Sequence, residues 1–183
     1  MKKILFAALT LACSLIGTTG QANASVETLV VPFSTPSTPT INQYYDWVRI
    51  DISGSGQSLS TRFNDAFYLY TDGPIAHDGS FYQLNFGTSP LAPFSPARNA
   101  ENFLVGPLPA YNSFHTYSFY LNTGTMTPTL LHFGVSDGIF SDNTGAYTIT
   151  VGQVPEPSSL ALIGLAFLSL FAFSLLRRSN AGV

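Results

Sequence analysis

The chain has 183 residues and a formal net charge of −3, and only 9% of its residues are charged. Three of the seven basic residues and nine of the ten acids fall between residues 25 and 153. This acidic balance argues against nucleic acid or anionic lipid as a partner. The one cysteine, Cys13, excludes a disulfide within the chain, so packing must supply the stability of the fold.

The N-terminus has the pattern of a secretory signal peptide. Met1-Lys2-Lys3 is charged, residues 4–16 are apolar, and Ala22 and Ala24 frame an A-x-A cleavage site. We therefore expect this segment to enter the secretion translocon and to be cleaved before Ser25.

A lipoprotein signal ending at Cys13 is the alternative for the same segment. It would cut the apolar stretch short, and Thr10 lies three positions before the cysteine, where it suits that signal poorly. Cleavage by the ordinary signal peptidase therefore remains the expectation.

Residues 25–153 have the pattern of strands rather than helices. Helical periodicity is nearly absent, and Thr, Ser, Gly, Asn, Tyr and Phe dominate. Residues 32–39 and 88–98 are rich in proline, and we expect them to be loops. Short segments of strand character follow one another along the chain: residues 26–31, 47–52, 66–70, 80–86, 103–105, 115–121, 130–135 and 146–151.

Alternation within these segments separates an inward from an outward face. Arg49 and Asp51 face away from the core as a solvated pair. The fold class predicted is all-β, an antiparallel, jelly-roll-like β-sandwich of about eight short strands. The expected inward residues are Val48, Ile50, Ile52, His115, Tyr117, Phe119, Leu121, Leu131, Phe133, Val135, Tyr147, Ile149 and Val151.

A turn-like stretch before the last predicted strand carries the best candidates for a metal site. Asp137, Asp142 and Asn143 supply the carboxylate and amide oxygens that calcium takes. The same Asp-Asn-x-Gly pattern is also that of a tight turn, because Asx side chains bond their own backbone and glycine accepts positive φ. The residues alone leave both interpretations open.

This stretch is similar to the C-terminal hairpin of galactose-binding-like sandwiches, including the calcium-dependent galactophilic lectins of bacteria. Asp142-Asn143 followed by Thr144-Gly145 matches their pattern, and Asp137 matches an earlier acid. The resemblance covers residues 130–151. It implies a calcium ion held by this loop, which in turn holds the hydroxyls of a sugar.

Catalytic signatures are weak, and we expect no enzyme. Gly134-Val135-Ser136-Asp137-Gly138 matches G-x-S-x-G, but a turn and a strand follow it where a nucleophile elbow needs a helix. The histidines lack zinc-binding spacing. They are His77, His115 and His132. By alternation Tyr68 and Tyr70 share a face, where they offer rings for stacking on a sugar.

The C-terminus has three parts in order. Val154-Pro155-Glu156-Pro157 is followed by residues 158–176, which are uncharged and apolar, and then by Arg177 and Arg178. About 20 apolar residues span a bilayer as a helix, so we expect one transmembrane helix with a cytoplasmic C-terminus. An ordinary single-pass anchor on a proline-rich stem is the alternative.

This arrangement resembles the PEP-CTERM sorting signal of Gram-negative bacteria, which a membrane protease of the exosortase class recognises. The resemblance implies processing near Val154 to Pro157, so that membrane anchoring is temporary. The predicted organisation is a signal peptide at 1–24, a β-sandwich domain at 25–153 and a sorting signal at 154–183.

These inferences define a function hypothesis. The chain is expected to be an exported structural protein of the cell envelope or of the extracellular exopolysaccharide. A calcium-dependent carbohydrate-binding module is the alternative, with calcium as the candidate cofactor and polysaccharide as the candidate ligand.

Overall fold

The computed structural model describes residues 25–59, 62–70, 75–79, 83–154, 164 and 167–169. The predicted signal peptide and most of the predicted sorting signal therefore lie outside the described residues. Within them, no helix is both long and apolar enough to cross a membrane.

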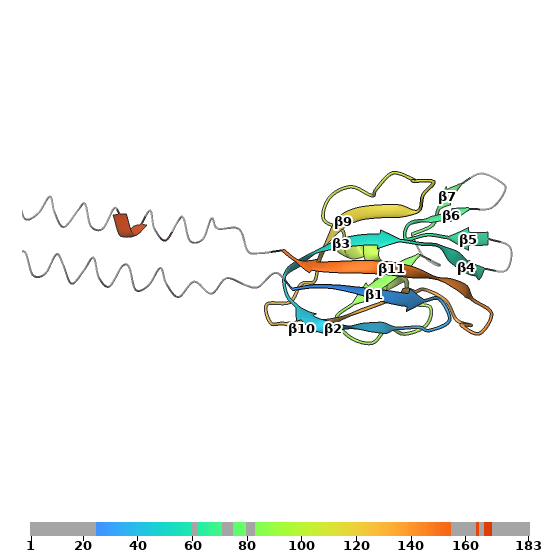
Figure 1. Ribbon diagram of the computed structural model, residues 1–183, viewed down its shortest axis with the longest axis horizontal. Coiled ribbons are helices and arrows are strands. Elements are labelled where there is room, and N and C mark those ends of the chain that lie inside the picture. Colours follow the sequence, from blue (N-terminus) through green and yellow to red (C-terminus); the bar gives the residue numbers. More distant parts are fainter. Residues whose placement is uncertain are drawn as a thin grey trace, which may run out of the picture.

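The larger sheet is built around β11 (Thr144–Gln153), the longest strand. β1 (Val26–Pro32) pairs along one edge of β11, and β3 (Trp47–Ser53) pairs along the other. β9 (Thr116–Asn122) pairs with the far edge of β3. All of these pairings are antiparallel, and the four strands lie side by side in Figure 1.

Four short strands extend this sheet beyond the end of β3. They run in the order β4, β5, β6 and β7 from the first residues of β11. Gly145 faces Gly56 there, and a Cβ on Gly145 would lie 2.5 Å from the Gly56 Cα. β4 and β11 can therefore pair this closely only because residue 145 is a glycine. The bounds are β4 (Gly56–Leu59), β5 (Arg62–Asn64), β6 (Tyr68–Tyr70) and β7 (Ala76–His77).

The smaller sheet has the order β2-β10-β8. β10 (Thr129–Val135) is the middle strand, between β2 (Thr38–Tyr44) and β8 (Leu84–Gly87). Two short 3₁₀ helices, η1 (Pro96–Arg98) and η2 (Ala100–Phe103), follow β8. Asn99, between them, bridges Asn85 at the free edge of β8.

One hydrophobic core joins the two sheets. Ile50, Tyr147 and Ile149 of the larger sheet are fully buried, as are Phe86 and Phe133 of the smaller sheet. Phe86 and Phe133 pack with their ring centroids 5.5 Å apart. Every inward residue predicted on β3, β10 and β11 is buried, because an antiparallel strand with one solvated face must alternate.

A buried carboxylate organises the end of the domain that carries β4 to β7. The Asp65 side chain is fully buried, and its Oδ1 accepts hydrogen bonds from the amides of Phe67 (3.0 Å) and Tyr68 (2.8 Å). Its Oδ2 accepts from His115 Nδ1 (2.9 Å) and the Tyr117 hydroxyl (2.8 Å). Four donors on one carboxylate join the β5–β6 turn to the start of β9.

The all-β, antiparallel prediction is confirmed, but the strand count is wrong. The described residues hold eleven strands rather than about eight. β2 begins inside the proline-rich stretch predicted as a loop, because it is an edge strand and Pro39 needs no ladder hydrogen bond on its free side. Residues 103–105 are not a strand; they end η2 and form a single bridge from Leu104 to Leu121.

His115 also differs from the prediction, which placed it within a strand. Its φ is +52° and β9 begins one residue later. The ring is nevertheless partly buried, as predicted for an inward residue, because its Nδ1 is hydrogen-bonded to Asp65 and the Tyr70 ring stacks on it with the ring centroids 4.5 Å apart.

Replacing Asp65 by Asn should destabilise the fold strongly. The amide group would face donors that the carboxylate accepts, and we expect the free energy of unfolding to fall by about 3 kcal/mol. Urea denaturation of the purified protein measures this loss. Asp142→Asn, at an exposed carboxyl, is the control and should change stability by less than about 0.5 kcal/mol. Equal losses in the two variants would contradict the role given to Asp65.

His132 should make the protein less stable at mildly acidic pH. Burial, and secondly the charge of Arg98, lowers the pKa of His132. Ser37 Oγ accepts from the Leu91 amide (3.2 Å) and lies 3.0 Å from His132 Nδ1, which suits a neutral ring. Because the folded-state pKa lies below the unfolded value of about 6.5, this stabilisation is complete above that pH and is lost as the pH falls through the folded pKa.

The comparison that isolates this effect is between the wild type and His132→Gln. The stability advantage of the wild type, measured by urea denaturation, should shrink between about pH 7.5 and 5. An advantage that stays constant or grows over this range would contradict the sign of the shift.

Candidate functional site

The outward side chains of the larger sheet form a flat polar surface, here called the outer face. Antiparallel register places residues of β1, β11, β3 and β9 in rows across the strands. The three rows are Val30, Thr148, Ser53 and Thr116; Thr28, Thr150, Asp51 and Ser118; and Val26, Gly152, Arg49 and Tyr120.

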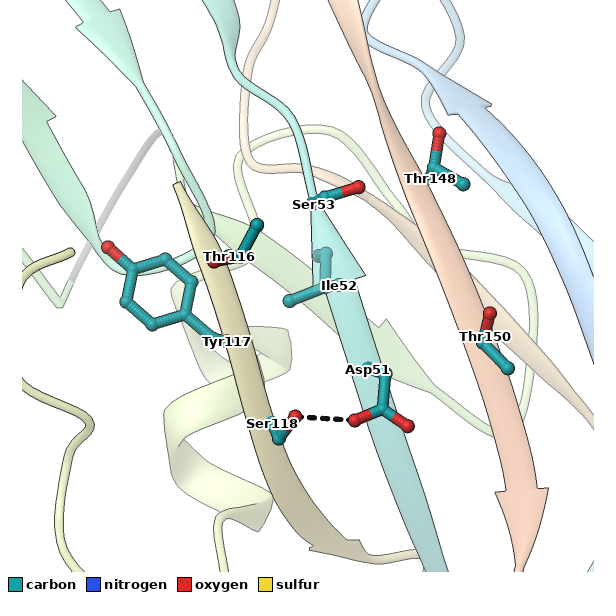
Figure 2. Close-up of a pocket in the computed structure, with 8 residues that line it drawn as sticks. All are labelled: Asp51, Ile52, Ser53, Thr116, Tyr117, Ser118, Thr148 and Thr150. Carbon is teal, nitrogen blue, oxygen red and sulfur yellow. Dashed lines mark hydrogen bonds between the residues drawn. The ribbon is translucent and has the colours of Figure 1, made fainter. Parts of the chain in front are cut away.

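A shallow depression of about 330 Å³ lies over the first two rows. Its size is at the lower end of that of ligand sites. Figure 2 shows hydroxyls of Ser53, Thr148 and Thr150 standing along neighbouring strands, with the Asp51 carboxylate among them. The lining is Asp51, Ile52, Ser53, Thr116, Tyr117, Ser118, Thr148 and Thr150.

Asp51 is the charged centre of this surface. Its Oδ1 accepts from Ser118 Oγ (2.5 Å) and from Arg49 Nη2 (3.0 Å). The hydrogen bond from Ser118, followed by the hydrogen bond and the charge of Arg49, holds the pKa of Asp51 below its ordinary value. Both contacts use Oδ1, so Oδ2 has no hydrogen-bond partner among the described residues and can accept from a ligand.

Aromatic rings border the depression at the end nearer Ser25 and Val154. Trp47 and Tyr120 are 42% and 44% exposed. Tyr120 lies opposite Arg49, and Trp47 lies opposite Asn122, which makes the two rings diagonal neighbours on paired strands. Because neither ring is buried in the core, their exposed surfaces are available to a ligand.

Gly152 leaves a gap in the row between Val26 and Arg49. A Cβ built there would meet only Val26 Cγ2, at 3.9 Å. The row therefore dips at β11, next to the depression and the rings. Together these residues provide hydroxyls that donate and accept, a carboxylate that accepts, and rings that stack, which suits a neutral, hydroxyl-rich ligand.

The three residues predicted to bind calcium differ in their exposure and in their hydrogen bonds. Asp142 is exposed. Asn143 is nearly buried, and its Nδ2 donates to the Phe33 carbonyl (3.0 Å), a structural role. Asp137 is also nearly buried, and its Oδ1 accepts from the Gly138 amide (2.6 Å) in a turn.

Ser136, the residue before Asp137, and Asn85, which lies opposite Gly134 on the paired strand, have buried polar atoms without partners. The Ser136 hydroxyl and both polar atoms of the Asn85 side chain are unbonded, and both residues are fully buried. In the described part of the chain, no group of three or more His, Cys, Asp or Glu side chains is placed to hold a metal ion.

The other residues predicted as candidates for a site make contacts within the domain. His77 Nε2 lies 2.7 Å from Glu101 Oε2. The Tyr68 hydroxyl donates to the Pro109 carbonyl (2.9 Å), and Tyr70 stacks on His115, so neither ring forms an open platform. The predicted outward placement of Arg49 and Asp51 was correct. The surrounding hydroxyls were missed, because residues on four strands become neighbours only through the register.

Of the predicted processing residues, only Ser25 and Val154 fall within the described residues; Ala22, Ala24, Pro155, Glu156, Pro157, Arg177 and Arg178 lie outside them. The Gln153 amide donates to the Ser25 carbonyl (2.9 Å), so the two ends of the domain are adjacent. The Gln153 side chain accepts a hydrogen bond from the Tyr45 amide and donates one to the Tyr45 carbonyl. The Val154 amide donates to the Trp47 carbonyl (3.1 Å).

Comparison with known proteins identifies the segment that begins where the domain ends. Residues 153–178 match the family model described as the PEP-CTERM protein-sorting motif. No curated protein and no solved structure matches the chain, so the predicted lectin resemblance gains no support. The motif indicates an exported protein that an exosortase sorts. The chain thus carries the PEP-CTERM sorting motif that its sequence predicts.

Proposed function

We propose that the chain is a non-enzymatic structural protein of the cell surface or the surrounding exopolysaccharide, delivered there by exosortase processing. The observation that supports this most strongly is the PEP-CTERM motif at residues 153–178. The predicted signal peptide at 1–24 starts the route, and the predicted helix at 158–176 holds the protein in the inner membrane until it is processed.

The end of the domain suits this sequence of events. The last hydrogen bonds of β11 are made by Gln153 and Val154, immediately before Pro155. A cut between Val154 and Pro157 would therefore leave all of β11, and with it the core, in the released product. The adjacent ends of the domain also allow both predicted membrane segments to attach at one side.

We further propose that the two sheets form a jelly-roll-like sandwich, a fold of surface-exposed proteins among others. The strand orders β1-β11-β3-β9 and β2-β10-β8 support this, because in each sheet strands distant in sequence alternate. Asn99 bridges Asn85 at the edge of β8 where a fourth strand of the second sheet would lie.

A calcium-dependent carbohydrate-binding module is the second candidate. The observation that favours it is the unbonded, buried hydroxyl of Ser136, the residue before Asp137, together with the unbonded side-chain oxygen of Asn85, which lies opposite Gly134. Oxygens of this kind complete a calcium site when a carboxylate is near. In this alternative, Asp137 and Asp142 supply the charge and Asn143 contributes its remaining oxygen.

Mass spectrometry of the exported protein tests the sorting proposal. We expect an N-terminus at Ser25, a C-terminus between Val154 and Pro157, and no peptide from residues 158–183. Replacing Arg177 and Arg178 by Ala should leave the chain uncut and in the membrane fraction, whereas Ser179→Ala, just outside the motif, should be processed normally. A secreted wild-type protein that still ends at Val183 contradicts the proposal.

Calorimetric titration with calcium tests the alternative. If the loop is a site, the wild type binds calcium at millimolar concentration or below, and Asp137→Asn weakens binding at least about tenfold because a carboxylate is lost. Asp46→Asn, in a separate turn, is the control. Asn143 is left unchanged because its bond to Phe33 supports the fold. Absence of heat at millimolar calcium would rule the alternative out.

A further inference from the structure

We propose that the outer face binds a neutral polysaccharide chain directly and without calcium. This inference rests on the proposed surface role and adds to it the site and the class of ligand. It concerns the opposite side of β11 from the core, not the loop that contains Asp137.

The polar part of the surface matches the chemistry of a sugar. The hydroxyls of Ser53, Thr116 and Thr148 can each donate one hydrogen bond and accept others, as sugar hydroxyls do. Ser118 already donates to Asp51, and Thr150 shares a hydrogen bond with Thr28, so these two mainly accept or hold their neighbours in place. Asp51 Oδ2 is an ionised acceptor held in place by the bonds that Ser118 and Arg49 make to Oδ1. A carboxylate whose second oxygen is open accepts a hydroxyl more strongly than a neutral group does.

The aromatic border supplies the apolar contact that such a ligand needs. Trp47 and Tyr120 are nearly half exposed at one end of the depression. The exposed face of each ring offers a flat apolar surface on which a sugar ring can stack. The rings and the hydroxyls thus adjoin on one surface.

The shape favours a chain over a single sugar. The rows cross four strands, which lie about 4.8 Å apart, so the surface is about 14 Å wide from β1 to β9. The depression is shallow and open, and Gly152, a diagonal neighbour of Trp47, adds no side chain between the depression and that ring. A linear polymer can lie along such a surface and contact several rows at once.

The charge favours a neutral polymer. Arg49 is engaged by Asp51, and the protein as a whole carries a net charge of −3. An anionic polymer would meet the Asp51 carboxylate without a free cation beside it. A second copy of the chain is a poorer occupant, because protein interfaces bury an apolar centre, whereas the first two rows present one carboxylate and, apart from Val30 at the edge, hydroxyls.

Affinity electrophoresis of the processed protein provides the test. The gels contain a soluble neutral β-glucan, a neutral galactomannan or, as the anionic control, alginate, each with and without EDTA. We expect at least one neutral polymer to retard the protein, alginate to have no effect, and EDTA to change nothing.

Two variants locate the site. Trp47→Ala removes a stacking surface and Gly152→Leu fills the gap, and each should weaken retardation about tenfold. Gly152→Leu should leave the urea midpoint within error, whereas Trp47→Ala should lower it because more than half of that ring is buried, so its retardation is compared under conditions in which it is fully folded. Phe114→Ala is the matched control, because this ring is 83% exposed outside the outer face. It should bind as the wild type does.

Several results would overturn the inference. They are no retardation by either neutral polymer, loss of retardation in EDTA, equal weakening by Phe114→Ala, or a dimer that Gly152→Leu dissociates. Loss of binding in EDTA would instead favour the loop of Asp137. Sorting is measured separately by mass spectrometry, so a correctly processed protein that binds no polymer would contradict this site alone.

Discussion

The pairing of β11 along both of its edges is the constraint on which the rest of the structure depends. β11 holds β1 on one side and β3 and β4 on the other, and its inward residues Tyr147 and Ile149 fill the core. Because alternation fixes both faces at once, the same strand that buries these residues must present Thr148 and Thr150 to solvent. The core and the outer face are therefore two consequences of one register.

The two ends of β11 serve different purposes. At its start, Tyr147 reaches the backbone carbonyl of Asp65, whose carboxylate gathers donors from the β5–β6 turn and β9. This network closes the end of the domain that carries the short strands. At the other end, Gln153 ties together Ser25, Tyr45 and Trp47. The hydrogen-bonded strands of the domain thus end where the sorting motif begins.

The local pattern of apolar residues in the sequence was sufficient to predict part of the fold. The inward faces of β3, β10 and β11 followed from strict alternation of apolar residues, which a half-buried strand requires. The short strands β4, β5 and β7 were not predicted because two to four residues carry too little periodicity. β2 was missed because Pro39 suggests a loop, and only the edge position of that strand makes the proline acceptable.

The sequence by itself determined the all-β class, the inward residues of the long strands and the sorting motif, because each depends on residues close together in the chain. Only the tertiary structure decided which polar residues act together. Asp65 and His115 are 50 positions apart, and Asp51 and Ser118 are 67 apart. No local spacing links such pairs. They meet because antiparallel register and a shared core bring distant strands within hydrogen-bonding distance.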